Sequence, residues 1–488
     1  MKRWRGALLV LVVFSMIAVA CGGTTGEVTP ETVTVTVQVP GETVTSIVTE
    51  TKTVEVETPT ITFWSTETQP ARVQITQGII DRFTAATGIN VIPVYVDENA
   101  LPETMVAAAA SGTLPDVVFH PIDFTVGWAE QGLLDMDAAA EVVKDLGADT
   151  FAQGALNMAT VNGTVAAVPS DGWGQLLIYR QDLFDANSLD RPDTYQKIEL
   201  AAKTLNDPGN NFYGITASTD AGAVFTQQTF EHFALANDCQ LTDDAGNVTL
   251  DTPECIEAIR FYTNLLKNYS PGGTQDVVTT RATYFAGQAA MIVWSPFIMD
   301  EMAGLRDSAL PTCPECVNDP AYLAKNSGFV PAFAGPNGSP AQYGQISYLG
   351  IGTGSNTDAA KKFIEFWLGD GYLDWLSTSV EGKFPMRRGT PDDPTKFIDG
   401  WKDLKTGVDR KAPLSDFYSP EVINELIAGA DNFQRWGFLQ GQGQLVTAIY
   451  TSLPVPKAIR DVLDGTLTPE TAAADLQAEV EQELELLK

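Results

Sequence analysis

The sequence holds few of the residues that catalytic and metal sites commonly use. Its 488 residues include only two histidines, His120 and His232, too few for a metal site built from histidines. No Gly-x-Ser-x-Gly elbow, His-Glu-x-x-His helix or phosphate-binding loop occurs. Two carboxylates would suffice for glycoside hydrolysis, but among 62 Asp and Glu residues no pair stands out. We therefore expect no catalytic residues, no metal and no cofactor.

Of the five cysteines, Cys21 lies near the N-terminus and the other four lie after residue 238. Cys239 and Cys255 flank a stretch with a hairpin-like Asp-Ala-Gly-Asn, and Cys313 and Cys316 form a CxxC pair. In an exported chain, four thiols indicate two structural disulfides, whose pairing the sequence leaves open. A lone CxxC also fits a redox or zinc motif, but no second CxxC and no nearby histidine supports zinc.

The N-terminus predicts export. Lys2, Arg3 and Arg5 precede an apolar run of 15 residues that ends at Cys21. A membrane span needs about 20 residues, so residues 1–20 are predicted to be a signal peptide. The small residues before Cys21 resemble a bacterial lipoprotein processing site, at which this cysteine is lipidated. The alternative is a secreted protein with an incidental cysteine.

The next segment has a composition unlike the rest of the chain. Residues 22–59 are rich in Thr, Val and Glu and contain no Trp, Phe or Tyr. Such a segment buries too little apolar surface to offset the entropy of ordering. Together with Cys21, it predicts an extended tether over 21–59, or a short β ribbon, holding a globular domain above a membrane.

The remaining residues, from Ile61 onward, exceed what one hydrophobic core usually serves, so two lobes are expected. The formal net charge of −32 argues against nucleic acid as a partner, because phosphates require a basic surface. It also argues against anionic lipid, and solubility outside the cell explains the acidity.

Alternating strands and helices begin this part of the chain. "TITFWST", "NVIPVYV" and "PDVVFH" have strand character, and the helical patterns "VQITQGIIDRFTAATGI" and "ALPETMVAAAASG" lie between them. This order predicts a doubly wound α/β lobe, in which ligands bind at the carboxyl ends of the strands. The residues at these ends are Trp64 and Glu67 after the first strand, and His120 and Asp123 after the third.

The order of several motifs resembles a known family. "IIDRFTAATGINVIPVYV", "ASGTLPDVVF", "VNGTVAAVPSDGWGQLLIYRQDLF", "FAGQAAMIVW" and "GKFPMRRGT" are similar to motifs of the ABC-transporter extracellular solute-binding proteins of family 1. This sugar-binding group includes the maltose-binding proteins. The matches run in family order over nearly all of residues 61–480.

The resemblance implies an α/β, two-lobed fold of the type II periplasmic-binding-protein kind. Each lobe would be a mixed sheet flanked by helices, with a ligand cleft between the lobes. Residues 60–168 and 345–384 would form the first lobe, and 169–344 and 385–488 the second. Pro169–Gly174 would then be a crossing segment, where Gly172 and Gly174 permit unusual φ angles at a hinge. An exposed loop with Trp173 packed on the surface is the alternative.

A sugar site combines flat aromatic rings with planar polar groups in a largely apolar cleft. Core packing remains an alternative for Trp294, a hinge role for Tyr343, a surface salt bridge for Arg387 and a structural role for His120. The candidate ligand-binding residues are Trp64, Glu67, His120, Asp123, Asp171, Trp173, Trp294, Tyr343, Arg387 and Trp436.

The resemblance also implies a function. The protein would be an extracytoplasmic, lipid-anchored monomer that captures a mono- or oligosaccharide and delivers it to the transmembrane subunits of an ABC permease. Two alternatives come from other classes: a glycoside hydrolase anchored at the cell surface, and an adhesin without a small ligand.

Overall fold

The computed structural model describes residues 28–39, 42–53 and 58–487 and divides into two compact units, with the boundary between Thr58 and Pro59. In the first unit, β1 (Val28–Val39) and β2 (Glu42–Thr53) form an antiparallel ribbon. A short ribbon was one of the two forms expected for the tether. The predicted signal peptide and the predicted lipidation site, Cys21, lie outside the described residues.

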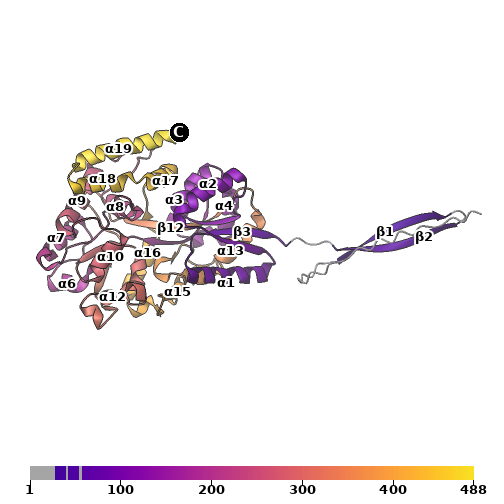
Figure 1. Ribbon diagram of the computed structural model, residues 1–488, viewed down its shortest axis with the longest axis horizontal. Coiled ribbons are helices and arrows are strands. Elements are labelled where there is room, and N and C mark those ends of the chain that lie inside the picture. The colour runs from indigo at the N-terminus through magenta and orange to yellow at the C-terminus, as the bar shows by residue number, and fades with distance from the viewer. Residues whose placement is uncertain (1–27, 40–41, 54–57, 488) are drawn as a thin grey trace, which may run out of the picture. The chain divides into compact units, whose positions relative to one another are not determined.

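The second unit contains a seven-stranded mixed sheet (Figure 1). Its order is β13-β8-β12-β5-β3-β4, with β16 beside β12. β3 is parallel to β4 and β5, whereas β12 is antiparallel to β5 and β8. The strands are β3 (Thr60–Ser65), β4 (Asn90–Tyr95), β5 (Val117–Pro121), β8 (Val168–Gly174), β12 (Gln342–Ile351), β13 (Phe384–Pro385) and β16 (Phe433–Gln434).

Helices cover this sheet and confirm the predicted strand–helix alternation. α1 has a proline in its first turn and ends at Gly88, whose φ of 72° is left-handed. Its Phe83 packs edge-on against Phe363, and Phe63 of β3 contacts the same ring, both at 5.2 Å between centroids. The helices of this lobe are α1 (Pro70–Thr87), α2 (Leu101–Ser111), α3 (Ile122–Glu130), α4 (Met136–Leu146), α5 (Gln153–Met158), α13 (Thr357–Trp367), α14 (Tyr372–Leu376) and α15 (Lys396–Lys402).

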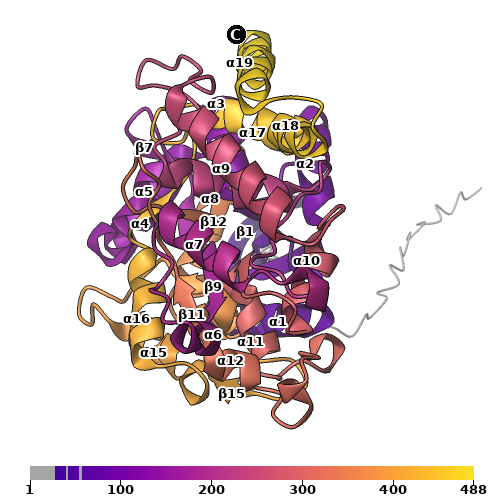
Figure 2. The same cartoon turned by 90° about the vertical axis from the view of Figure 1, so that its left-hand side faces the viewer.

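A second, three-stranded antiparallel sheet forms the other lobe, in the order β10-β9-β11. Figure 2 shows β9 and β11 of this sheet among the helices of the lobe. Its strands are β9 (Leu176–Arg180), β10 (Met291–Trp294) and β11 (Ser327–Val330). Its helices are α6 (Gln181–Ala186), α7 (Tyr195–Leu205), α8 (Val224–Ala236), α9 (Pro253–Tyr269), α10 (Val277–Phe285), α11 (Met299–Met302) and α12 (Tyr322–Asn326). Disulfides join Cys239 to Cys255 and Cys313 to Cys316 in this lobe.

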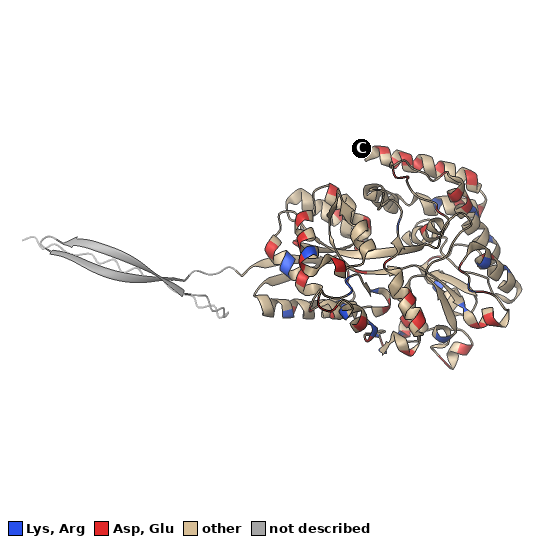
Figure 3. Cartoon of the chain, turned by 180° about the vertical axis from the view of Figure 1, so that it is seen from behind, with Lys and Arg blue, Asp and Glu red and all other residues tan. Residues whose placement is uncertain are grey.

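The chain ends in four further helices, and acidic residues lie along the last of them (Figure 3). These are α16 (Pro420–Gly429), α17 (Gly443–Ser452), α18 (Pro454–Asp464) and α19 (Pro469–Leu486). Two small hairpins complete the fold: β6 (Thr160–Val161) with β7 (Thr164–Val165), and β14 (Lys405–Thr406) with β15 (Ala412–Pro413). Within the described ranges, no helix combines the length and the apolar character that crossing a bilayer requires.

The chain passes from the large sheet to the small one at a single residue, Gln175, between β8 and β9. The backbone N–H of Gln175 donates to the carbonyl of Tyr343 at 2.8 Å. Residues 169–174, expected to form a crossing segment, belong to β8 and pair with β12 and β13. The lobe boundaries proposed from the sequence assign these residues to the second lobe, although they pair within the large sheet.

The two glycines in this segment do not have the unusual φ angles that were predicted for them. Neither Gly172 nor Gly174 has a positive φ. A Cβ atom on Gly174 would instead lie 2.2 Å from the side chain of Gln342, and one on Gly172 would lie 2.8 Å from the carbonyl oxygen of Gln345. Glycine is therefore needed here because β8 and β12 approach closely, and not because the backbone bends unusually.

Candidate functional site

A cavity of about 380 Å³ lies between the two lobes. The large-sheet lobe contributes the turn after β3, Arg72 of α1, the C-terminal part of β5, and the segment around Lys383. The small-sheet lobe contributes Gln228 of α8 and Phe297 of the short helix η4 (Pro296–Ile298). A molecule in this cavity therefore touches both lobes at once.

The floor of the cavity is formed by two paired strands. Asp171 and Trp173 of β8 lie opposite Ser347 and Gln345 of β12, and all four side chains line the cavity. Residues two apart on a strand share a face, so this pairing places an aromatic ring, a carboxylate, an amide and a hydroxyl side by side. The alternation of Asp171 and Trp173 with two glycines is thus a strand pattern.

A buried charge cluster forms one wall. The Nζ atom of Lys383 lies 2.6 Å from Oε1 of Glu67 and 3.3 Å from Oδ2 of Asp171. Arg72 donates to Oε2 of Glu67 at 2.5 Å. Burial alone would raise the pKa of Glu67, but the charges of Lys383 and Arg72 hold that pKa at about 2. Glu67 is therefore ionised near neutral pH and accepts hydrogen bonds.

Neighbouring groups fix the carboxylate of Asp171. The indole N–H of Trp375 donates to Oδ1 at 2.6 Å, and the hydroxyl of Ser170 donates to the same oxygen at 2.9 Å. The ammonium of Lys383 also lies 4.3 Å from the centroid of the Trp375 ring, a cation–π contact. These contacts hold the polar wall in place before any ligand arrives, which limits the ordering cost of binding.

The predicted residue Trp173 is half-buried on the cavity floor. Its ring lies 6.3 Å from that of Phe297, nearly perpendicular to it, and 6.0 Å from that of Tyr343. Trp173, Glu67 and Asp171 therefore line one cavity. Trp294, also proposed from the sequence, lines a second cavity beside it.

Besides Trp294 and Asp123, five other predicted residues do not line this cavity. Trp64 is half-buried against the core, and His120, Tyr343, Arg387 and Trp436 are buried. Burial lowers the pKa of His120 to about 4, and its Nδ1 lies 3.1 Å from the carbonyl oxygen of Pro121. His120 is therefore neutral at physiological pH and lies inside the fold, outside the lining of the cavity.

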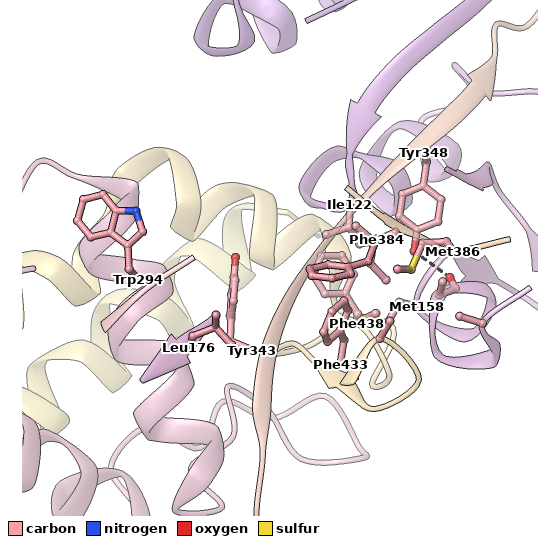
Figure 4. Close-up of a cluster of buried hydrophobic side chains, with 14 of the residues drawn as sticks. Ile122, Met158, Leu176, Trp294, Tyr343, Tyr348, Phe384, Met386, Phe433 and Phe438 are labelled. Atoms are coloured by element: carbon pink, nitrogen blue, oxygen red, sulfur yellow. Dashed lines mark hydrogen bonds between the residues drawn. The ribbon is translucent and has the colours of Figure 1, made fainter. Parts of the chain in front are cut away.

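The remaining three of these side chains satisfy groups inside the protein. Arg387 donates to the carbonyl of Leu146 at the end of α4 and to that of Leu368 after α13, where helix ends leave carbonyls without partners. The indole N–H of Trp436 donates to the carbonyl of Cys239. Tyr343 lies among the buried side chains around β12 (Figure 4).

Asp123 is outside the cavity lining but contacts a residue that belongs to it. It forms an ion pair with Arg435 at 2.7 Å and accepts a hydrogen bond from the amide of Gln345, which lines the cavity. Arg435 also pairs with Glu231 of α8 at 3.1 Å. Asp123 therefore holds Gln345 in position and connects α3 of one lobe with α8 of the other through Arg435.

Sequence reasoning missed several residues of the cavity. Gln345 and Ser347 alternate in "GQISY", so the period of two in this predicted strand could have indicated them. Lys383 lies in the "GKFPMRRGT" segment, from which Arg387 was chosen instead. Arg72, Gln228 and Phe297 carry no local signal, because tertiary contacts alone bring them to the site.

In the described part of the chain, no group of three or more His, Cys, Asp or Glu side chains is arranged to hold a metal ion. The cavity instead offers fixed hydrogen-bond acceptors and donors next to an indole ring. Such a site suits an uncharged ligand that has several hydroxyl groups and an apolar face.

Comparison with known proteins assigns the family. Residues 68–373 match the profile of the bacterial extracellular solute-binding proteins, so the chain belongs to this family. A relative from Escherichia coli (strain K12), "Putative ABC transporter periplasmic-binding protein YcjN", is 30% identical over 397 residues, which cover 79% of this chain and 86% of the relative.

Two solved structures are similar in fold. Maltose-bound MalE3 of T. maritima has a TM-score of 0.64 at 20% identity, covering 86% of this chain and 99% of MalE3. An ABC transporter solute-binding protein of Agrobacterium vitis S4 with bound D-mannitol has a TM-score of 0.59 at 21% identity, covering 88% of this chain and 99% of that protein. The fold is the two-lobed α/β fold of type II periplasmic binding proteins, as the sequence predicted.

Proposed function

We propose that this protein is the substrate-binding lipoprotein of an ABC importer, which captures a carbohydrate or polyol in the cavity between its lobes. The proposal includes a lipid anchor at Cys21 and delivery of the solute to membrane permease subunits. Membership of the solute-binding family supports the class, and the maltose and D-mannitol bound to the two similar structures support the chemical nature of the ligand.

One observation carries the choice of ligand: Trp173 lies beside Asp171 and the Glu67–Lys383 pair in the same cavity. A pyranose ring has an apolar C–H face that packs on an indole, while its hydroxyl groups need fixed donors and acceptors. Glu67 is ionised because its pKa is about 2, so it accepts hydrogen bonds from hydroxyl groups over the whole physiological pH range.

The mechanism follows from the position of the cavity. Gln228 and Phe297 come from one lobe and the charge cluster from the other, so a ligand that contacts both favours the conformation in which the lobes are closed. We propose that this closed, loaded form is the one that docks on the permease. A dissociation constant in the micromolar range corresponds to about −8 kcal/mol of binding free energy.

Replacing Trp173 with alanine tests the site. We expect the affinity for the best-binding sugar to fall tenfold or more, about 1.4 kcal/mol, because the ring that packs on the sugar face is lost. Isothermal titration calorimetry measures the affinity, and thermal unfolding verifies that the variant remains folded. Val317→Ala, at an exposed residue outside the lining of the cavity, is the control. Unchanged affinity in Trp173→Ala would place the ligand elsewhere.

A further inference from the structure

A second cavity of about 400 Å³ adjoins the first. Five residues line both: Gln69, Arg72, Trp173, Gln228 and Phe297. We call the cavity with Lys383 the first compartment and the one with Trp294 the second compartment. Each lies within the size range of complete small-molecule sites, roughly 300 to 1,000 Å³. The two compartments therefore form one continuous site divided at Trp173 and Phe297.

The second compartment has an aromatic wall. Trp294, at the end of β10, packs edge-to-face against Phe225 with 4.8 Å between ring centroids, and both line the compartment. This contact holds the indole in place, with 7% of Trp294 left exposed. Ser295 and Gln175 lie on the same lining and add a hydroxyl and an amide.

An ion pair between an arginine and a glutamate also lines the second compartment. Arg281 donates to both carboxylate oxygens of Glu301, at 2.9 and 3.1 Å, and Arg306 lies 3.7 Å from the same carboxylate. Glu301 is buried, while Arg281 is about a quarter exposed on the cavity side of α10. A paired guanidinium and carboxylate present planar donors and acceptors that match neighbouring hydroxyl groups.

The two compartments thus repeat one combination: an indole ring beside a carboxylate held by cations. In the first these are Trp173 with Glu67, and in the second Trp294 with Glu301. We propose that the ligand consists of two linked sugar rings, one in each compartment, with the linkage beside Trp173 and Phe297. This inference rests on the proposed carbohydrate-binding function.

A smaller ligand uses only part of this site. A single ring fills one compartment and leaves the groups of the other to water. A linear polyol has no flat apolar face to pack on either indole ring, so the aromatic walls gain little from it. A two-ring ligand contacts both walls and is therefore expected to bind more tightly than either of its halves.

The test compares ligands on the full protein by calorimetry. Glucose, galactose, mannose and D-mannitol are titrated beside maltose, trehalose, cellobiose and lactose. At least one disaccharide should bind ten times more tightly than each of its component monosaccharides and than D-mannitol. If a monosaccharide or D-mannitol binds as tightly as any disaccharide, the inference fails while the proposed function stands. If none of the eight binds, both fail.

A matched pair of variants locates the second ring. Val277 lines the second compartment and is 44% exposed, whereas its neighbour Val278 is 62% exposed and is not part of the lining. Val277→Trp should fill the compartment and lower the affinity for the disaccharide about tenfold, toward that of its monosaccharides. Val278→Trp should leave the disaccharide affinity unchanged. Equal affinities in the two variants would overturn the assignment of the second ring.

Discussion

Glu67 remains charged in a buried place because two cations oppose the effect of burial. The pKa of its carboxyl is lowered to about 2, below the ordinary value near 4.5. A carboxyl whose pKa is depressed in the folded state stabilises the fold above its unfolded pKa, and this stabilisation is lost as the pH falls toward 2. The carboxyl of Glu67 should therefore stay ionised at any pH well above 2.

The two histidines are buried in their neutral form, whereas Glu67 is buried in its charged form. Both are fully buried, and burial lowers the pKa of His120 to about 4 and that of His232 to about 3. Unfolded histidine has a pKa near 6.5, so between these values the unfolded chain binds a proton that the folded chain does not. Stability should therefore fall as the pH decreases from about 6.5 toward 3 or 4.

His232→Gln tests this pH dependence. The wild type should lose about 2 kcal/mol more unfolding free energy than the variant between pH 7 and pH 5, because unfolded His232 is protonated over this interval. Urea unfolding at the two pH values measures the difference, and the contributions of other titrating groups cancel between the two proteins. Parallel pH profiles would show that His232 is not held neutral in the fold.

At the scale of elements, β8 decides the geometry of the site. Its Asp171 and Trp173 face the cavity, while Gly172 and Gly174 occupy the opposite face. There the carbonyl oxygen of Gln345 leaves no room for a Cβ atom on Gly172, and the side chains of Gln342 and Phe433 leave none on Gly174. Because residues alternate between the faces of a strand, the two larger side chains lie on one face of β8 and the two glycines on the other. One face holds the ligand groups and the other permits close packing.

Gly174→Ala should therefore destabilise the protein, by about 1 to 3 kcal/mol, as over-packing in a core does. Gly78 of α1 is the matched control, because a Cβ atom there meets nothing within 4 Å. Gly78→Ala should be neutral or stabilising by up to about 1 kcal/mol, since alanine favours a helix. Thermal unfolding of the two variants measures both effects. A stable Gly174→Ala protein would contradict the close packing of Gly174 against the side chains of Gln342 and Phe433.

Local patterns in the sequence predicted the elements better than the site. The strands and helices between Thr60 and Pro121 follow the predicted order, since each depends on its own periodicity and caps. The Pro169–Gly174 segment was interpreted as a crossing because the family resemblance implies one there and because glycine permits unusual φ angles. Its strand pairing depends on β12, far along the chain, and no local pattern carries that information.

The same distinction applies to the site residues. Glu67 was predicted from its place after a strand, and Asp171 and Trp173 from their place in the supposed crossing segment; the structure places all three in the lining of one cavity. Arg387 and Trp436 have equally suitable side chains, but their partners are carbonyl groups inside the protein. A residue type predicts what a side chain can bind, and only the fold decides which partner it meets.

At the scale of the whole molecule, a buried ion network connects the lobes. Arg435, fully buried, pairs with Asp123 of α3 and Glu231 of α8, and the hydroxyl of Tyr450 donates to Glu231 at 2.6 Å. A buried charge left without its partner is strongly destabilising, so the members of this network must stay together. The network therefore supports the floor of the cavity through the amide of Gln345.

The division into two compact units predicts that the second unit is sufficient for binding. A protein made of Pro59–Lys488 alone should unfold at the same temperature as the full chain and bind the same sugars with the same affinity, because the described cavities are lined by its residues alone. Thermal unfolding and calorimetry of the two proteins provide the comparison. A loss of affinity on removal of residues 1–58 would show that this segment contributes to binding.

The central place of β12 has a consequence for biosynthesis. Ile351 pairs with Val117 and Gly344 with Gly174, so β12 joins β5 and β8, two strands made much earlier. Until the ribosome has passed residue 351, the growing polypeptide lacks the strand that unites its main sheet. We expect such a nascent chain to remain unfolded and thus suitable for threading through a translocation channel, so that folding is completed only after translocation.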